Sequence, residues 1–274
     1  PYTGMRMTDT TLAMRKDLTK DLVGKVGVPV LPHVVLQKPR RGKVMPLEAL
    51  KTQVSANYFP AIAKPCSLGS SIGVALVKDH QELAEVLPTI FAQDPLVMIE
   101  PAVQDLEEYN VSVMMRDGEL LTSAIERPKQ SGELLDFKEK YLAGGGGGKK
   151  GTVSGTKVPG DSGSGGMLSM TRDINPQLAP AFDARIRDIA KTVYTSLGSV
   201  GVPRLDFLYN KATEELWFNE INPIPGSFAF FLWERAATPF TFPALLNHMI
   251  DEATSQARWS DADPVPKDAY LLKR

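Results

Sequence analysis

The sequence predicts an α+β protein built from two lobes. Strand-like and helix-like segments alternate along its 274 residues, and strands joined by short turns argue against a purely parallel sheet. A hydrophobic content of 43% and a charged content of 23% are typical of a folded domain. Because an apolar strand ends in a polar, proline-containing segment near residues 95–103, we expect one lobe over residues 1–99 and a second over residues 100–274.

The first lobe is expected to begin with a long helix. Apolar residues recur at helical intervals from Leu12, Thr8 or Asp9 can cap the helix, and Gly27 with Pro29 ends it. The elements expected in this lobe are helices over residues 8–26, 46–56 and 79–93 and strands over residues 30–36, 61–65, 72–77 and 96–100.

The second lobe is expected to contain hairpins and a long helix. Asp117-Gly118 lies between two apolar runs, which indicates a hairpin turn. Residues 144–166 hold 11 of the chain's 22 glycines, so we expect a mobile lid there rather than a packed element. The other elements expected are strands over residues 109–115, 120–126, 202–209 and 215–221 and helices over residues 176–197 and 243–256.

Composition excludes several classes of protein. Lys and Arg number 31 and Asp and Glu number 32, so no basic excess exists to neutralise a nucleic-acid backbone. Cys66 is the single cysteine, which excludes an intrachain disulfide and a cysteine-rich zinc site and favours a reducing compartment. No apolar run reaches the roughly 18 residues that a membrane-spanning helix needs. We therefore expect a cytoplasmic protein that binds neither nucleic acid nor membrane.

A turn of small residues after a lysine is a candidate phosphate-binding loop. Lys64 ends an apolar strand, and Gly69-Ser70-Ser71 lies before the next strand. Backbone N–H groups in such a turn can bind phosphate, and the lysine adds positive charge. The lysine precedes the glycine and no helix follows, unlike the Gly-x-x-x-x-Gly-Lys-Ser/Thr loop. A plain hairpin turn explains the same residues, so this segment alone leaves both interpretations open.

Three oxygen-bearing side chains on two paired strands predict a metal site. Asp206 lies on the first strand, and Glu220 and Asn222 are two residues apart on the second, so these two project to one side. Carboxylate and amide oxygens beside substrate phosphates are typical ligands of Mg²⁺. The alternative is a structural ion pair of Arg204 with Asp206 or Glu220.

Two further charged segments carry weaker signals. Asp136–Tyr141 precedes the glycine-rich stretch, and a solvated surface explains it equally well. Glu100 and Glu107-Glu108 flank a strand exit between the lobes, where exposed backbone can pair with a nucleotide base. An acidic surface loop is the plain alternative for this second segment.

These segments, in this order, resemble the D-alanine–D-alanine ligase branch of the ATP-grasp enzymes. The most specific match is Arg204-Leu205-Asp206-Phe207 followed by Asn219-Glu220-Ile221-Asn222-Pro223-Ile224-Pro225-Gly226, against Arg-x-Asp-Phe and Glu-x-Asn-x-x-Pro-Gly in the family. Lys64-Pro65 with Gly69-Ser70-Ser71-x-Gly73 matches the family's phosphate loop, and Lys140-Tyr141-Leu142 matches its active-site loop. The resemblance implies an ATP-grasp fold, in which two α+β lobes sandwich the nucleotide.

The resemblance also assigns roles to individual residues. The nucleotide contacts it implies are Lys16 and Lys64 at the phosphates, Glu100 and Val103 at adenine and Glu108 at the ribose. The metal ligands it implies are Asp206, Glu220 and Asn222. The catalytic groups it implies are Arg204, Ser70, Ser71, Lys140, Tyr141 and the backbone of Gly226.

The activity implied by the resemblance is ADP-forming ligation of a carboxylate to an amine. ATP phosphorylates the carboxylate, and the amine attacks the acyl phosphate to give an amide or peptide bond. The implied cofactors are ATP and two Mg²⁺ ions, with Mn²⁺ as a substitute, and the implied substrates are small molecules such as amino acids. The resemblance allows a homodimer. The alternatives are a nucleotide-binding regulatory or inactive module and a ligase that acts on a larger substrate.

Three features depart from the family pattern. The family's N-terminal substrate domain would precede Pro1 and is absent from this sequence, and residues 144–166 are longer and richer in glycine than the usual loop. Phe231 stands where the family has a serine near the carboxylate of the second substrate. We therefore expect an acceptor other than a small D-amino acid, unless Ser227 supplies the hydroxyl.

Overall fold

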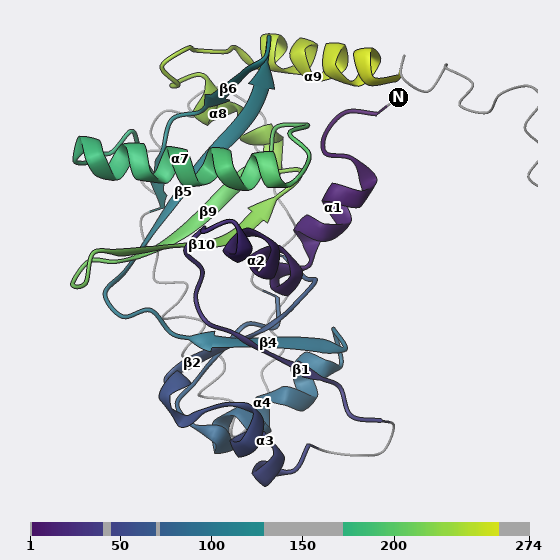
Figure 1. Ribbon diagram of the computed structural model, residues 1–274, viewed down its shortest axis with the longest axis vertical. Helices are drawn as coiled ribbons and strands as arrows, with labels where there is room; N and C mark the ends of the chain where they lie inside the picture. The colour runs from purple at the N-terminus through teal and green to yellow at the C-terminus, as the bar shows by residue number, and fades with distance from the viewer. Residues whose placement is uncertain (1, 41–44, 70–71, 129–171, 258–274) are drawn as a thin grey trace, which may run out of the picture.

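Two antiparallel sheets form the framework of the protein (Figure 1). The computed structural model describes residues 2–40, 45–69, 72–128 and 172–257. The smaller sheet has the strand order β1-β4-β2-β3, and the larger has the order β10-β9-β5-β7-β8 with β6 paired to β5. Every pairing between these strands is antiparallel, so the predicted α+β class is confirmed.

The smaller sheet carries its helices on one apolar side. Asp79 begins α4 by accepting hydrogen bonds from the backbone N–H groups of Gln81 and Glu82, at 2.8 and 2.9 Å. Leu83 and Leu87 of this helix pack into a fully buried cluster with the sheet. The elements are β1 (Val34–Gln37), α3 (Leu47–Gln53), η1 (Ala56–Tyr58), β2 (Ala61–Pro65), β3 (Ala75–Val77), α4 (His80–Phe91) and β4 (Leu96–Pro101).

The larger sheet is covered by helices on both faces. On one face α7 packs across the strands, as Figure 1 shows, and its Ile186 belongs to the same buried cluster as Phe207 and Phe218. On the other face Trp233 of α8 and Leu245 of α9 form a separate cluster. The elements are β5 (Leu106–Arg116), β6 (Glu119–Thr122), β7 (Glu126–Pro128), β8 (Arg172–Ile174), α7 (Pro180–Ser196), β9 (Arg204–Asn210), β10 (Glu215–Asn222), η2 (Gly226–Ala229), α8 (Phe230–Trp233) and α9 (Phe242–Ala257).

The N-terminal helices pack against the larger sheet rather than the smaller one. Ala13 of α1 (Met7–Met14) and Val23 of α2 (Lys16–Lys25) belong to the same buried cluster as the strands β9 and β10. The chain reaches the smaller sheet only after Val28, which is part of this cluster too. Residues from both sides of the predicted boundary at residue 99 therefore share one core, and the division into two lobes stays a prediction.

The predicted helix over residues 8–26 is wrong in one respect, because it is two helices. Arg15 has an extended backbone, with φ −98° and ψ 93°, and separates α1 from α2. The N–H group of Lys16 then donates to the carbonyl of Cys66 at 2.9 Å. A contact with a residue 50 positions away in sequence therefore decides the break, and it leaves Lys16 as the first residue of α2.

Several predicted strand and helix ends also differ. The strand expected from residue 30 begins at Val34, because Val30 instead forms a bridge with Phe218 at the edge of the larger sheet. The strand expected over residues 120–126 divides into β6 and β7, since the N–H group of Ala124 donates to Leu232 of α8 at 3.1 Å. Two expected elements are shorter than predicted, namely the strand over residues 72–77 and the helix over residues 176–197. The glycine-rich residues 144–166 lie outside the described residues.

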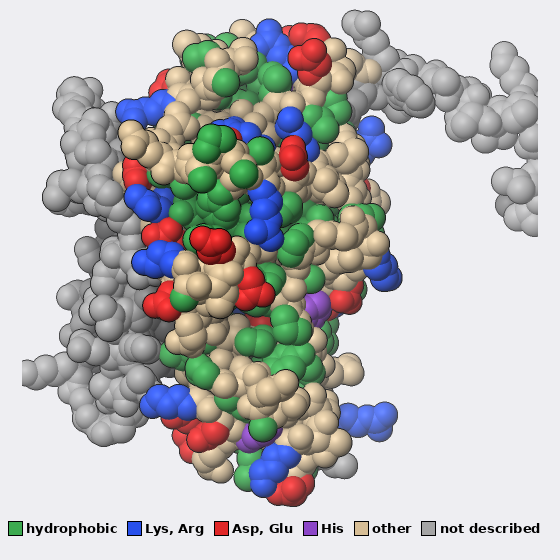
Figure 2. Space-filling view, turned by 60° about the vertical axis from the view of Figure 1, so that its left-hand side comes forward, with side chains coloured by type: hydrophobic (Ala, Val, Ile, Leu, Met, Phe, Trp, Pro, Cys, Tyr) green, Lys and Arg blue, Asp and Glu red, His purple; other side chains and the backbone are tan. Residues whose placement is uncertain are grey.

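Charged side chains of both signs are interspersed on the face of the molecule in Figure 2. This distribution agrees with the net charge of −1. Among the described residues, none of the helices has the length and hydrophobicity required to cross a bilayer.

Candidate active site

The hairpin of β9 and β10 carries the predicted metal ligands. Its register places Glu220 opposite Asp206 and Asn222 opposite Arg204. A β-bulge between Phe218 and Glu220 shifts the register on β10. Bulges redirect side chains and are common beside active sites. The bulge brings the carboxylates of both strands to one face of the sheet, where they line a common cavity.

Arg204 holds Asp206 in a two-point contact. Its Nε and Nη2 atoms donate to Oδ1 and Oδ2 of Asp206, each at 2.7 Å, and Nδ2 of Asn222 donates to the same Oδ2 at 2.9 Å. The ion pair that the sequence offered as an alternative to a metal site is therefore present. Because a carboxylate can accept about four hydrogen bonds, this pair leaves lone pairs on Asp206 for another ligand.

Burial and neighbouring carboxylates raise the pKa values of two acidic groups in the cavity, Asp206 and Glu108. Burial raises the pKa of Asp206 to about 6, Arg204 opposes the rise, and Glu220 and Glu126 add to it. Burial also raises the pKa of Glu108, with Asp206 and Glu220 as further causes. Burial opposes ionisation of the Arg204 guanidinium, but its hydrogen bonds to Asp206 and the nearby carboxylate charges together outweigh burial and raise its pKa. Clustered, partly desolvated carboxylates of this kind favour binding of a cation.

Lys16 connects the predicted phosphate-binding loop to the predicted metal site. Its Nζ atom lies 3.3 Å from Oε2 of Glu220 and also donates to the carbonyl of Leu68. The amino group comes from the first turn of α2, which follows the break at Arg15. Lys16 therefore lies between the predicted phosphate-binding loop and the predicted metal site, two segments whose proximity the sequence alone did not indicate.

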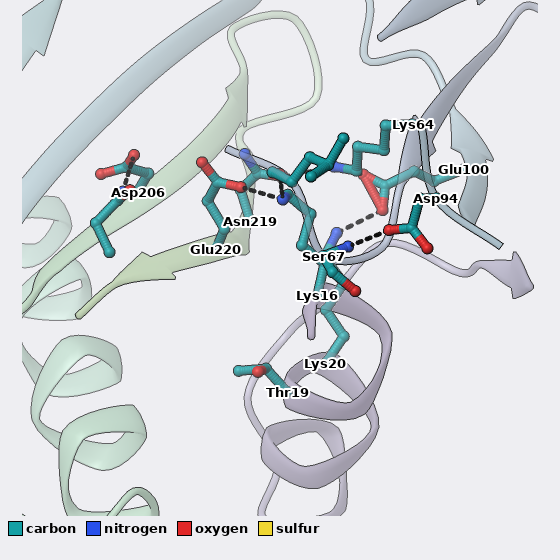
Figure 3. Close-up of polar contacts among 12 residues, drawn as sticks. Lys16, Thr19, Lys20, Lys64, Ser67, Asp94, Glu100, Asp206, Asn219 and Glu220 are labelled. Carbon is teal, nitrogen blue, oxygen red and sulfur yellow. Dashed lines mark hydrogen bonds and ion pairs between the residues drawn. The ribbon is translucent and has the colours of Figure 1, made fainter. Parts of the chain in front are cut away.

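Lys64 lies in a buried network between the two sheets (Figure 3). Its Nζ atom donates to Oε1 of Glu100 at 2.7 Å and to Oδ1 of Asn219 at 3.0 Å. Nζ of Lys20 donates to the other carboxylate oxygen of Glu100 at 2.5 Å. Burial opposes ionisation of Glu100, but Lys64 and Lys20 outweigh it and lower the pKa of Glu100 to about 2. Glu100 is 2% exposed, and its predicted contact with adenine stays a prediction.

A cavity of about 510 Å³ opens on this arrangement. Its walls contain six of the predicted site residues, four residues that were not predicted as site residues, and Phe207. The predicted residues that line the cavity are Glu108, Arg204, Asp206, Glu220, Asn222 and Gly226. Lys16 contacts one of them, Glu220. The lining residues that were not singled out as site residues are Asn110, Asn219, Ile224 and Pro225.

Other predicted residues lie outside this group. Val103 is half-buried in the connection between β4 and β5, and its contact with adenine stays a prediction. Ser70, Ser71, Lys140 and Tyr141 lie outside the described residues, so their roles stay predictions as well.

Two residues of the network were missed by the sequence analysis. Lys20 is four residues after Lys16, so both lie on one face of α2, and this spacing was the available signal. Asn219 could not have been found from strand alternation, because regular alternation would point it away from Glu220. The bulge removes that alternation and lets Asn219 reach Lys64.

Phe231 lies beside a series of contacts that runs from the partly exposed Arg172 to the buried Glu126 and on to Asn110 in the cavity wall. The guanidinium of Arg172 is 4.9 Å from the centre of its ring, and Nη1 of Arg172 lies 2.9 Å from Oε1 of Glu126. Glu126 is 1% exposed and accepts a hydrogen bond from Nδ2 of Asn110 at 3.3 Å. Ser227, the alternative hydroxyl, is exposed and has a left-handed backbone with φ 49°.

The donor atoms fit a hard cation. Asp206, Glu220 and Asn222 offer carboxylate and amide oxygens, and such oxygens are the ligands that Mg²⁺ prefers. Within the described ranges, three or more His, Cys, Asp or Glu side chains nowhere group closely enough to hold a metal ion. A metal here would thus depend on the Asn222 amide and on ligands outside the chain, such as phosphate oxygens.

Two antiparallel sheets with lysines and paired carboxylates between them define an ATP-grasp protein, and solved structures of that fold superpose on the chain. The chain belongs to the family described as the D-ala D-ala ligase C-terminus, whose sequence profile matches residues 22–154 and 167–251.

Named relatives agree with this family. A D-alanine–D-alanine ligase of Helicobacter pylori (strain HPAG1) is 33% identical over 237 residues, which are 86% of this chain and 58% of that protein. The crystal structure of a D-alanine–D-alanine ligase from Helicobacter pylori has a TM-score of 0.63 and 26% identity, over 91% of this chain and 61% of that one. A ligase structure of the same name from Coxiella burnetii has a TM-score of 0.68 at 23% identity, over 95% and 62%, and supports the fold alone. The chain thus spans about three-fifths of the proteins it resembles.

Proposed function

We propose that the chain is the nucleotide- and metal-binding part of an ATP-dependent carboxylate–amine ligase. It would form an amide or peptide bond, as the D-alanine–D-alanine ligases it resembles are named to do. The observation that carries the proposal is the contact of Lys16 with Glu220, which lines one cavity together with the Arg204–Asp206 pair. That arrangement combines cations for phosphate oxygens with carboxylates for a metal ion, which phosphoryl transfer requires.

The lysines would receive the phosphates of ATP. Lys16 enters from α2 and Lys64 from β2, so they approach from two directions. Asp206, Glu220 and Asn222 would hold Mg²⁺, or Mn²⁺ in its place, and two ions are expected from the resemblance. The metal would supply positive charge that bridges the phosphate oxygens.

Arg204 would stabilise charge that develops during the two steps. In the first step a carboxylate oxygen bonds to the γ-phosphorus and ADP leaves. In the second step the amine nitrogen bonds to the acyl carbon, phosphate leaves and the nitrogen gives up a proton. Both steps place negative charge on oxygen atoms, and a guanidinium held by Asp206 is already oriented to meet that charge. We place the acceptor near Gly226, which lines the same cavity.

ADP release tests this proposal. It is measured on the chain, and on any longer natural form that contains it, with Mg²⁺, ATP, D-alanine and other small carboxylates and amines. We expect ADP release that requires both a carboxylate and an amine. Arg204→Met should lower that rate about 100-fold or more, the order of loss for removing a transition-state donor, while nucleotide still binds.

The alternative of a regulatory or inactive module gives a different result. Such a module would bind ATP with Mg²⁺ and release no ADP with any substrate pair. Arg204→Met would then change neither binding nor turnover.

A further inference from the structure

Lys20 is the buried charge that the proposed reaction leaves unexplained. Its side chain is fully buried, and it is not among the residues that line the cavity. Burial lowers the pKa of its amino group to about 8, against the opposing effect of Glu100. A lysine is seldom buried to this degree without a partner, and its partner here is one carboxylate oxygen of Glu100.

Glu100 divides its two oxygen atoms between two lysines. Oε2 accepts from Lys20 at 2.5 Å and Oε1 accepts from Lys64 at 2.7 Å (Figure 3). A carboxylate held at one oxygen by a buried partner cannot rotate freely. The Oε1 atom that orients Lys64 is therefore held in place by Lys20, on the far side of the carboxylate.

The amino group of Lys64 donates two hydrogen bonds and has one further N–H bond available for a ligand. Among the described residues its Nζ atom has two hydrogen-bond acceptors, Glu100 and Asn219. An ammonium group has three N–H bonds, so one stays available for a ligand. The two lysines and one carboxylate also leave a net charge of +1 in the buried network, which favours an anion at that free N–H bond.

We propose that Lys20 is a positioning residue, which fixes Glu100 so that Lys64 presents its free N–H bond to a nucleotide phosphate. The proposal rests on the proposed nucleotide site. It also explains why the α1–α2 break matters, because α2 supplies Lys16 to Glu220 and Lys20 to Glu100. Lys20 touches no substrate in this scheme and acts only through Glu100.

A double-mutant cycle on nucleotide binding tests the coupling. Lys20→Met keeps the length of the side chain and leaves a neutral Glu100–Lys64 pair, so the fold is expected to survive. We expect it to weaken binding of ATP with Mg²⁺ about tenfold, the usual range for coupled neighbours. In a Lys64→Met background the same change should weaken binding less than twofold. Equal losses in both backgrounds would mean that Lys20 is only structural, and would overturn the proposal.

Thr19→Val is the matched control. Thr19 is the neighbouring buried residue of α2, and its hydroxyl donates to the carbonyl of Leu12 at 2.6 Å, away from Glu100. It should lower the melting temperature without changing nucleotide affinity. If it weakens binding as much as Lys20→Met does, damage to α2 explains both and positioning is refuted.

A second measurement does not depend on nucleotide binding. NMR relaxation of the Lys64 amino group should report restricted motion in the parent and clearly faster motion in Lys20→Met. Unchanged motion would overturn the proposal. If the unmutated protein binds nucleotide but releases no ADP, only the proposed ligase function is refuted. If the unmutated protein binds no nucleotide, the proposed nucleotide site is refuted, and the NMR measurement alone decides whether Lys20 positions Lys64.

Discussion

Asn219 accepts a hydrogen bond from Nζ of Lys64 at 3.0 Å, and this contact joins the larger sheet to the smaller one. Asn219 lies at the bulge of β10, and Lys64 lies near the end of β2. Glu220 follows Asn219 directly and meets Lys16. One bulge therefore sends adjacent side chains to two different lysines, and the proposed nucleotide site depends on it.

Neutralising Glu220 should remove the effect of metal-bound nucleotide on stability. A ligand at 100 times its Kd stabilises a protein by about 2.7 kcal/mol, which corresponds to a rise in melting temperature of roughly 5–10 °C for a chain of this size. We expect that rise for the parent with ATP and Mg²⁺ and expect Glu220→Gln to lose most of it. Thermal melts with and without ligand measure both.

Glu215→Gln is the control for that experiment. Glu215 is the exposed first residue of β10, on the same strand but outside the cavity lining. It should keep the full rise. A Glu220→Gln variant that gains as much as the parent would contradict the metal assignment.

Asp206 should make metal-free stability depend on pH. Its pKa of about 6 lies above the ordinary 3.8, so the folded state binds this proton more tightly than the unfolded state. The penalty for ionised Asp206 is therefore full above pH 6 and disappears as the pH falls toward 4. Relative to Asp206→Asn, the parent should gain on the order of 3 kcal/mol of unfolding free energy between pH 7 and pH 4. Urea unfolding at both pH values measures this difference, and a constant offset between the two proteins would show that the carboxyl has an ordinary pKa.

Gly201 should tolerate no side chain, because the N-terminal segment packs on it. Its φ is +81°, and an added Cβ would lie 2.6 Å from the backbone N of Met5. Gly118 has the same φ and open space around its Cα. Both changes to alanine should cost about 1–2 kcal/mol for the left-handed backbone, and Gly201→Ala should cost about 1–3 kcal/mol more for the clash. Equal losses in urea unfolding would mean that residues 4–5 do not pack there.

Phe231 should influence which amine acts as acceptor. A phenyl ring cannot donate to a substrate carboxylate, and a hydrogen bond to a charged group is worth about 1.5–3 kcal/mol. Phe231→Ser should therefore raise kcat/KM for D-alanine about 10- to 150-fold over that of the parent, relative to a bulkier apolar amine. Phe228→Leu, a change of a nearby half-buried ring, is the control and should leave the ratio unchanged. Efficient ligation of two D-alanine molecules by the unmutated protein would refute a role in altered specificity.

The alternation of strand-like and helix-like segments was sufficient to predict the α+β class, and the motif at β9 and β10 was sufficient to predict the candidate metal ligands as neighbours. Strand pairing across a short turn is a local relationship, so the two strands could be paired from the sequence. Regular register would place Asn219 opposite Asp206, and the bulge is what puts Glu220 there. The order of the segments was sufficient to predict the family, which is confirmed. The start of α4 at Asp79 was readable for the same reason, because a cap joins residues only a few positions apart. The cap expected at Thr8 or Asp9 is wrong, since α1 begins at Met7 after Arg6 and has no side-chain cap.

The tertiary structure alone decided the break at Arg15, the bulge at Asn219 and the burial of Glu100 between two lysines. Each depends on a partner far away in sequence: Lys16 on Cys66, Asn219 on Lys64, and Glu100 on Lys20, 80 residues away. Local propensity carries no information about such partners. A charged residue in a sequence looks the same whether it will face water or a buried counter-charge, and only the packing of α2 between the two sheets determines which of the two it meets.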